Sequence, residues 1–205
     1  MFSIIQAAGW PIWPLLLCSV VALALVIERF SSLRASRVMP PRLLDEVLAV
    51  STPQLPAPEM VDRLAESSLL GEVLAAGLRA VTAEPQMPEA QLRQVFEFAG
   101  RRAVQQLERY MNTLGTIATA APLLGLMGTV VGMIEIFGSQ APGGGNPAQL
   151  AHGISIALYN TAFGLMIAIP ALMFYRYFRG RIEEYVLELE AAADCLLGQL
   201  RRYTA

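Results

Sequence analysis

The feature that most constrains this chain is a run of about sixty-six residues, from Tyr110 to Tyr175, whose only formally charged side chain is Glu135. A cluster of turn-forming residues at 141–147 divides the run. Each half exceeds the roughly twenty residues that cross a hydrocarbon core, and a backbone in lipid satisfies its own hydrogen bonds only as a helix or a closed barrel. The run therefore predicts a transmembrane helical hairpin.

A third apolar stretch runs from about Trp10 to Phe30, with Trp10 and Trp13 where an interfacial aromatic belt would lie. The alternative is a cleaved signal peptide, but such a peptide carries its basic residues before the apolar run, and here they follow it. The composition, 55% hydrophobic and 16% charged with mean hydropathy +0.48, leaves too little polar surface for a soluble domain. We expect an all-α integral membrane protein with three spans, surrounded by membrane lipids.

Arginine placement predicts the orientation. The short segments before the first span and between the second and third contain no Arg, so all the basic residues fall on the other side of a three-span topology. By the positive-inside rule that side is cytoplasmic, with the N-terminus outside. The net charge of −2 gives no reason to expect a nucleic-acid partner. The arginines nearest the spans are Arg29, Arg34, Arg37, Arg42, Arg101, Arg102, Arg109, Arg176, Arg179 and Arg181.

Prolines cut the cytoplasmic loop into helical pieces, and the middle piece repeats apolar or small residues every three or four positions: Leu64, Ser67, Gly71, Leu74, Leu78 and Val81. A further helix from Pro88-Glu89 is expected to run unbroken into the second span, and the stripe Ile182, Val186, Leu189, Ala193, Leu196 and Leu200 extends the third. Both are expected to project tens of ångströms into the cytoplasm.

These expectations divide the chain into seven segments. They are a periplasmic N-terminus at 1–9, spans at 10–30, 110–137 and 148–177, a cytoplasmic helical loop at 31–109, a periplasmic turn at 138–147, and a cytoplasmic C-terminal helix at 178–205. Asn146 is the expected N-cap of the third span.

Small residues line one face of each half of the hairpin. In lipid, spans associate by close approach through such residues. Two alternatives remain open: the faces pack the hairpin on itself, or they assemble an oligomer. The faces are Ala121, Gly125, Gly128 and Gly132 in the second span, and Ala157, Thr161, Gly164 and Ala168 in the third.

Polar side chains in the spans are few, and an ionisable or polar group in a membrane is a candidate for an ion pathway. Threonine hydroxyls commonly bond their own helix backbone, so each alone favours a structural role. Glu135 lies near the outer end of its span, where an interfacial carboxylate is tolerated. The candidates are Thr129, Glu135, Ser155, Asn160 and Thr161.

An enzyme is not expected. The only histidine, His152, lies at the outer edge of a span, and all three Asp residues lie in cytoplasmic segments, so no catalytic group set can meet in the bilayer. The sequence shows no paired Cys/His metal spacing and no phosphate-binding glycine loop, and no cofactor is expected.

Two motifs carry a family resemblance: the segment 122–134, PLLGLMGTVVGMI, and the segment 153–165, GISIALYNTAFGL, followed by Ala168-Ile-Pro170. Together with the Glu28-Arg29 ending of the first span, they resemble the MotA/TolQ/ExbB proton-channel family, most closely its ExbB branch. The likeness covers nearly the whole chain.

The resemblance implies an inner-membrane motor subunit in bacteria, forming a homopentameric ring around single-span ExbD- or TolR-like partners that carry the titrating Asp. It implies energy transfer to a TonB-like transducer for outer-membrane transport, or to a TolA-like one in the Tol-Pal envelope system. The family's two pore-facing threonines align with Thr129 and Thr161, and its acidic residue early in the third span aligns with Ile156. The carboxylate is therefore expected from the partner. The rival from another class is a passive membrane scaffold.

Overall fold

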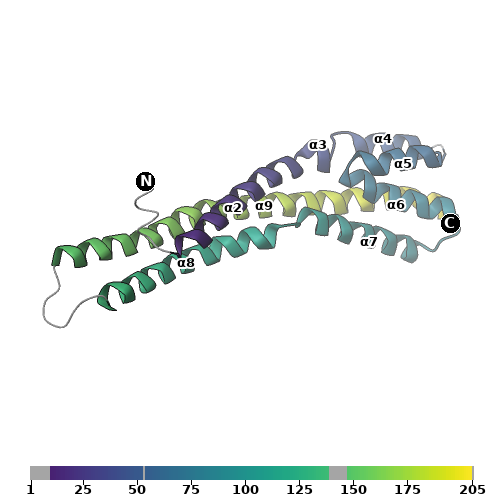
Figure 1. Ribbon diagram of the computed structural model, residues 1–205. Helices are drawn as coiled ribbons and strands as arrows, with labels where there is room; N and C mark the ends of the chain where they lie inside the picture. The colour runs from purple at the N-terminus through teal and green to yellow at the C-terminus, as the bar shows by residue number, and fades with distance from the viewer. Residues whose placement is uncertain (1–9, 53, 139–146, 205) are drawn as a thin grey trace. The chain divides into compact units, whose positions relative to one another are not determined.

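The computed structural model describes residues 10–52, 54–138 and 147–204. The expected periplasmic N-terminus, nearly all of the expected turn and the proposed cap Asn146 lie outside these ranges. Within them the chain is helical and contains no strand (Figure 1). The helices are α2 (Ile12–Ser32), α3 (Ala35–Val38), α4 (Leu43–Ser51), α5 (Pro58–Ser67), α6 (Leu69–Ala83), α7 (Glu89–Leu107), α8 (Met111–Gly138) and α9 (Pro147–Thr204).

The chain divides into two compact units. The first comprises Met1–Glu28 with Tyr110–Tyr177, and the second Arg29–Arg109 with Phe178–Ala205. Three helical stretches, in α2, in the α7–α8 region and in α9, are long and apolar enough to cross a membrane by length and composition.

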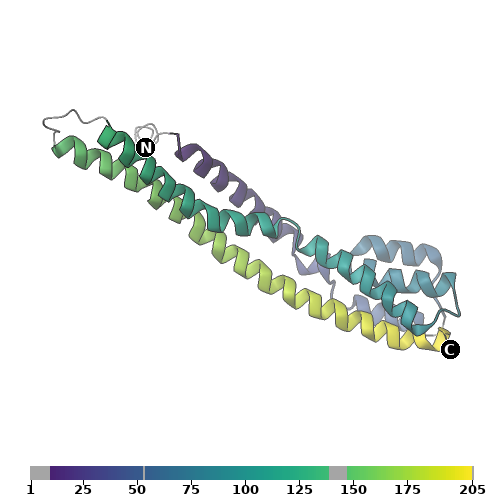
Figure 2. The same cartoon turned by 90° about the horizontal axis from the view of Figure 1, so that it is seen from below.

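In the first unit α2, α8 and the first part of α9 lie side by side (Figures 1 and 2). Leu15 from α2, Ala121 from α8 and Ala168 from α9 form a buried cluster, on which Leu124 and Phe163 pack. The outward face of α2 is apolar, with Trp13, Leu17, Val20, Leu23 and Ile27 all more than 60% exposed. That is the surface expected of a helix that faces lipid.

The prediction of one unbroken helix from Pro88-Glu89 into the second span is wrong. Helix α7 ends at Leu107, and α8 begins at Met111. Between them Tyr110 has φ 63°, in the left-handed region that an α-helix cannot continue through. Apolar periodicity continues across the break because both helices keep a buried face.

The end of α7 is held by a buried arginine. Arg29 is only 2% exposed, and its Nη1 donates a hydrogen bond of 2.9 Å to the carbonyl oxygen of Leu107. The last carbonyls of a helix have no partner within it, so this guanidinium acts as a cap supplied by α2.

Replacing Arg29 with Met is expected to destabilise the protein by about 1–3 kcal/mol, because the Leu107 carbonyl would stay buried without this donor. The unfolding midpoint in detergent would fall. Arg37→Met, at an exposed arginine in α3, is the matched control and should leave the midpoint unchanged. Equal midpoints for both variants would contradict this role of Arg29.

The middle piece of the second unit is two helices, where the sequence predicted one. Ser68 separates α5 from α6: its backbone is extended, and its Oγ accepts a hydrogen bond of 3.0 Å from the Gly71 amide as an N-cap. A Cβ at Gly71 would lie 2.1 Å from the Leu64 carbonyl oxygen, so only glycine allows this turn. The predicted stripe holds within α6, where Leu74, Leu78 and Val81 are buried.

The last part of α9 lies at the edge of the second unit, with one side against the other helices and the opposite side exposed (Figure 2). Of its predicted stripe, Ile182, Leu189, Leu196 and Leu200 are buried, whereas Val186 and Ala193 are half-buried. Polar contacts fix the same segment. The Gln199 Nε2 donates to the Leu48 carbonyl at 2.7 Å, and the Tyr203 hydroxyl donates to the Ser51 carbonyl at 2.9 Å.

Tyr185 makes two hydrogen bonds in this unit, one to the Leu33 carbonyl and one with Arg181. Its hydroxyl donates to the Leu33 carbonyl at 3.0 Å and accepts from Arg181 Nη2 at 3.1 Å. The hydrogen bond with Tyr185 raises the pKa of Arg181 above its already high ordinary value. Arg181 therefore stays charged at every physiological pH.

Gly77 in α6 lies directly against the Phe96 ring of α7. A Cβ there would lie 2.0 Å from Cζ of Phe96, a ring that is only 5% exposed. Gly77→Ala is therefore expected to destabilise the protein by about 1–3 kcal/mol through overpacking. Gly198→Ala is the control, because a Cβ there meets nothing within 4 Å, and it should raise stability by about 0.5–1 kcal/mol. Thermal unfolding of the two variants in detergent separates these outcomes, and a stabilised Gly77→Ala would contradict the contact.

Candidate functional site

The small faces of α8 and α9 lie against each other within one chain. A Cβ at Gly125 would lie 2.7 Å from the carbonyl oxygen of Asn160, and one at Gly164 would lie 2.6 Å from the carbonyl oxygen of Ala121. Contacts that short with backbone atoms leave no room for any side chain. The two backbones therefore approach as closely as small-residue membrane contacts allow.

The contact continues toward the C-terminal end of α8. A Cβ at Gly128 would lie 2.8 Å from Cβ of Asn160, and one at Gly132 would lie 3.1 Å from Cβ of Ala157. Ala157 and Ala168 are buried along the same side of α9. The glycines and alanines of these two faces pack the hairpin on itself.

Asn160 occupies the space that the glycines leave. It is 2% exposed, and its amide group lies beside Gly128. The sequence placed Asn160 among the polar lining candidates, and the structure puts it between the two helices. A polar group held in this way in a membrane is expensive, which marks the position as more than packing.

Thr161 lies beside Asn160, with its Cα opposite Gly125. Its Oγ1 is fully buried, and no hydrogen-bond partner for it occurs among residues 10–52, 54–138 and 147–204. The residue as a whole is half-buried, so the exposed part of the side chain is not the hydroxyl. A rotation about χ1, between the two rotamers that threonine adopts in helices, would move the hydroxyl to another of the three staggered positions around Cβ.

Thr129 lies one turn beyond Gly125 on α8. Its hydroxyl donates to the Leu126 carbonyl at 2.6 Å, the local bond that threonine commonly makes in membrane helices. The side chain borders a shallow hollow on α8 together with Val130, Met133, Ile134 and Phe137. Thr129 is thus half-buried at the surface of the helix pair, whereas the Thr161 hydroxyl is inside it.

The remaining polar candidates lie apart from this contact. Glu135 on α8 and Ser155 on α9 are both exposed, and Ile156, where the resemblance leads us to expect an acidic residue in other members, is half-buried. Sequence reasoning left out Thr116 and Thr119, which are exposed on α8 and bond their own backbone at 2.8 and 3.1 Å. Their spacing of three residues could have shown that they share a face.

Comparison with known proteins shows the family of this chain. Residues 65–191, which include both threonines and the whole α8–α9 contact, match the MotA/TolQ/ExbB proton channel family. The chain belongs to that family. The resemblance drawn from the two motifs is confirmed, and the protein is an all-helical membrane protein of a proton-channel family.

Three relatives illustrate the match. The chain is 32% identical over 174 residues to the biopolymer transport protein exbB1 of Vibrio cholerae, covering 82% of this chain and 74% of the relative. It is 33% identical over 179 residues to the putative biopolymer transport protein ExbB-like 3 of Synechocystis, covering 85% and 82%. It is 39% identical over 97 residues to the Tol-Pal system protein TolQ of Haemophilus influenzae, covering 44% and 42%.

Proposed function

We propose that this chain is a proton-channel subunit of the bacterial inner membrane that energises TonB-dependent outer-membrane transport together with an ExbD-like, single-span partner. Membership of the proton-channel family and the longer alignments with ExbB-type relatives support the proposal. The N-terminus lies in the periplasm and the C-terminus in the cytoplasm, as the arginine distribution predicts.

The observation that carries the proposal is the Thr161 hydroxyl. A buried hydroxyl without a partner costs about 1–3 kcal/mol, so such a group calls for an explanation. A hydroxyl can donate and accept at once, which suits a group that hands a proton on. Thr161 is the primary residue of the path, and Thr129, one turn beyond Gly125, is the second.

The titrating acid comes from the partner in this proposal. Between Tyr110 and Tyr175 the sequence has one carboxylate, Glu135, and it lies near the outer end of its span. A proton crosses a low-dielectric region only by binding transiently to a group there. Since the two spans offer hydroxyls and an amide, an Asp on the partner's span completes the path.

The mechanical step follows from the charge on that Asp. Neutralising a carboxylate in a membrane changes its desolvation cost by several kcal/mol, which is enough to change the position it prefers within a ring. A pentamer around a two-fold partner has no arrangement in which all contacts are satisfied together. Proton binding and release then drive relative rotation, which a TonB-like transducer passes on.

Work on a TolA-like transducer of the Tol-Pal system is the second candidate, and the match to a TolQ protein favours it. The partner's identity decides between the two candidates. A co-purified single-span protein with one Asp in its span and a small periplasmic domain of ExbD type supports the first candidate, and one of TolR type supports the second.

Proton flux into proteoliposomes tests the proposal against a passive scaffold. Vesicles with this chain and its partner should take up protons when a pH gradient is imposed, and vesicles with either protein alone, or with the partner's Asp replaced by Asn, should not. Assembly of the complex without any partner-dependent flux would overturn the proposal in favour of a scaffold.

A further inference from the structure

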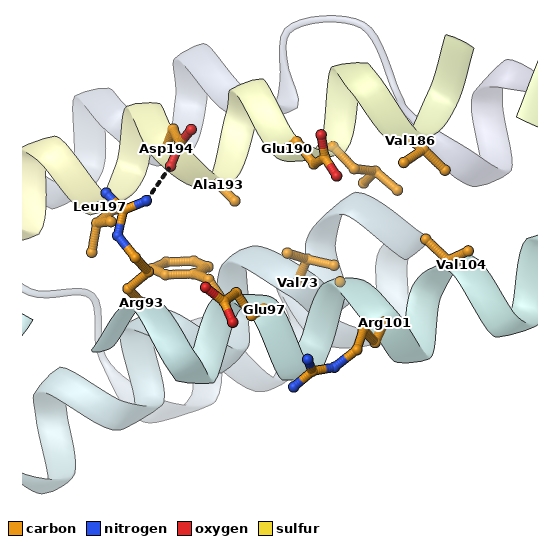
Figure 3. A pocket seen from close by; sticks show the side chains of 13 residues that line it. Val73, Arg93, Glu97, Arg101, Val104, Val186, Glu190, Ala193, Asp194 and Leu197 are labelled. Atoms are coloured by element: carbon orange, nitrogen blue, oxygen red, sulfur yellow. Dashed lines mark ion pairs between the residues drawn. The ribbon is translucent and has the colours of Figure 1, made fainter. Parts of the chain in front are cut away.

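A groove of about 420 Å³ opens between α7 and α9 in the second unit (Figure 3). Its apolar part includes Val73, Val104 and Leu197, and charged side chains from both helices stand at its edges. One end is bridged by an ion pair of 3.8 Å between Arg93 and Asp194. The volume is in the range of sites that bind a ligand or a protruding side chain.

Small residues keep the groove open. Gly100 lines it on α7, and a Cβ there would meet nothing within 4 Å. Ala193 lines it on α9 and is only half-buried, although the apolar stripe of that helix passes through it. The stripe residue Val186 is also half-buried at the groove. This part of the stripe therefore has apolar surface that no part of the chain within the described ranges covers.

Helix α7 also carries a protruding aromatic side chain, Phe98. Phe98 on α7 is 60% exposed. At 100° per residue, Phe98 lies roughly 120° around α7 from the line of groove residues formed by Glu97, Gly100 and Val104. The hollow and the protruding ring thus face different sides of one helix, and neither can fill the other within one chain.

Charge complementarity points the same way. Arg102 lies one turn after Phe98 on the same side of α7 and is exposed. Glu190 stands at the edge of the groove on α9. Among the described residues neither has an ion-pair partner, unlike the Arg93–Asp194 pair beside Glu190. The hollow also carries Glu97 and Arg101, so its charges outside the Arg93–Asp194 pair are two acids and one base. An added cation such as Arg102 is therefore matched by this net negative charge.

We propose that Phe98 of one copy of this chain inserts into the α7–α9 groove of the next copy, with Arg102 beside the neighbour's Glu190. A contact between two different surfaces repeats head to tail, and it forms a closed ring when the rotation from one copy to the next closes. The proposal rests on the homo-oligomer of the proposed function and adds the surface that joins its subunits outside the membrane. A second copy is the occupant because both complementary halves occur on this chain.

Disulfide cross-linking in membranes tests the contact. In full-length chain with Cys18→Ala and Cys195→Ser, the pair Phe98→Cys and Ala193→Cys should give, on oxidation, a ladder of dimer, trimer and higher bands. A ladder is the signature of head-to-tail contact, because a symmetric contact stops at dimers. The matched control replaces Met60, an α5 residue that is 52% exposed, in place of Phe98 and should give no ladder.

A charge exchange checks the orientation. Arg102→Glu in the cross-linking background should reduce the ladder about fivefold, because it places two acids together, and adding Glu190→Arg should restore it. An equal ladder from the Met60 variant, or no restoration by the exchange, would overturn the contact. Absence of the ladder together with normal partner-dependent proton flux would overturn the Phe98 contact and leave the proposed function standing. A ladder without proton flux would support the contact and overturn the proposed function.

Discussion

Thr161→Val is expected to abolish transport energised by the proton gradient while leaving the protein folded and assembled. Valine has nearly the same shape as threonine, and the hydroxyl it removes is buried without a partner among the described residues. Removing such a group is close to neutral for stability or slightly stabilising. The chain would lose the group that we assign to proton transfer and almost nothing else. Energised nutrient uptake in cells, with the amount of assembled complex measured alongside, reports both effects.

Thr161→Ser is the matched control, because it keeps the hydroxyl and removes only the methyl. Uptake by this variant should stay within a fewfold of the wild type, at a cost of about 1 kcal/mol in packing. Normal uptake by Thr161→Val would remove the assignment of Thr161. Loss of the complex in that variant would show that the hydroxyl is structural.

Gly164→Leu is expected to have the largest effect on stability of any single substitution considered. A Cβ at this position would lie 2.6 Å from the Ala121 carbonyl oxygen and 3.2 Å from Cα of Gly125, both of them backbone atoms that cannot turn away. The two helices would have to separate, with loss of the close contact that holds them in lipid. A destabilisation of roughly 3 kcal/mol or more is expected. Titration of detergent-solubilised protein with dodecyl sulfate measures the change as a lowered midpoint.

Gly180→Leu makes the same substitution further along α9, where a Cβ would meet nothing within 4 Å. It should leave the midpoint unchanged or raise it slightly, since glycine is a poor helix former. Equal midpoints for the two leucine variants would contradict the α8–α9 contact described here.

The spans and their small-residue faces could be predicted because they depend on local pattern. A charge-poor run of sufficient length has few alternatives in a membrane, and residues spaced by three or four share a helix face whatever surrounds them. The buried positions Leu189, Leu196 and Leu200 followed from the same periodicity. So did the small-residue faces of α8 and α9, whereas their contact with each other was one of two open alternatives and comes from the structure.

The breaks could not be predicted, because they depend on single residues whose conformation is set by the surroundings. Tyr110 takes a positive φ at the end of α7, where Arg29, remote in sequence, caps the last carbonyl of the helix. Ser68 acts as an N-cap within an apolar pattern that runs on through it. Neither residue interrupts the periodicity, so the pattern alone indicates continuous helix.

The orientation of the polar side chains could not be predicted from the sequence either. Periodicity placed Asn160 and Thr161 on or near the small face of α9, but could not tell which atoms would be buried. That depends on how closely Gly125 and Gly128 allow the helices to approach. The result is that the amide of Asn160 fills the contact and the Thr161 hydroxyl is enclosed beside it.

The decisive measurement is a density map of this chain in complex with its single-span partner. We expect Thr129 and Thr161 to lie on the side of the α8–α9 pair that faces the partner, with the Thr161 side chain within hydrogen-bonding reach of the partner's carboxylate. Bulky aliphatic side chains facing the partner, with both threonines turned toward lipid, would contradict the proposed proton path.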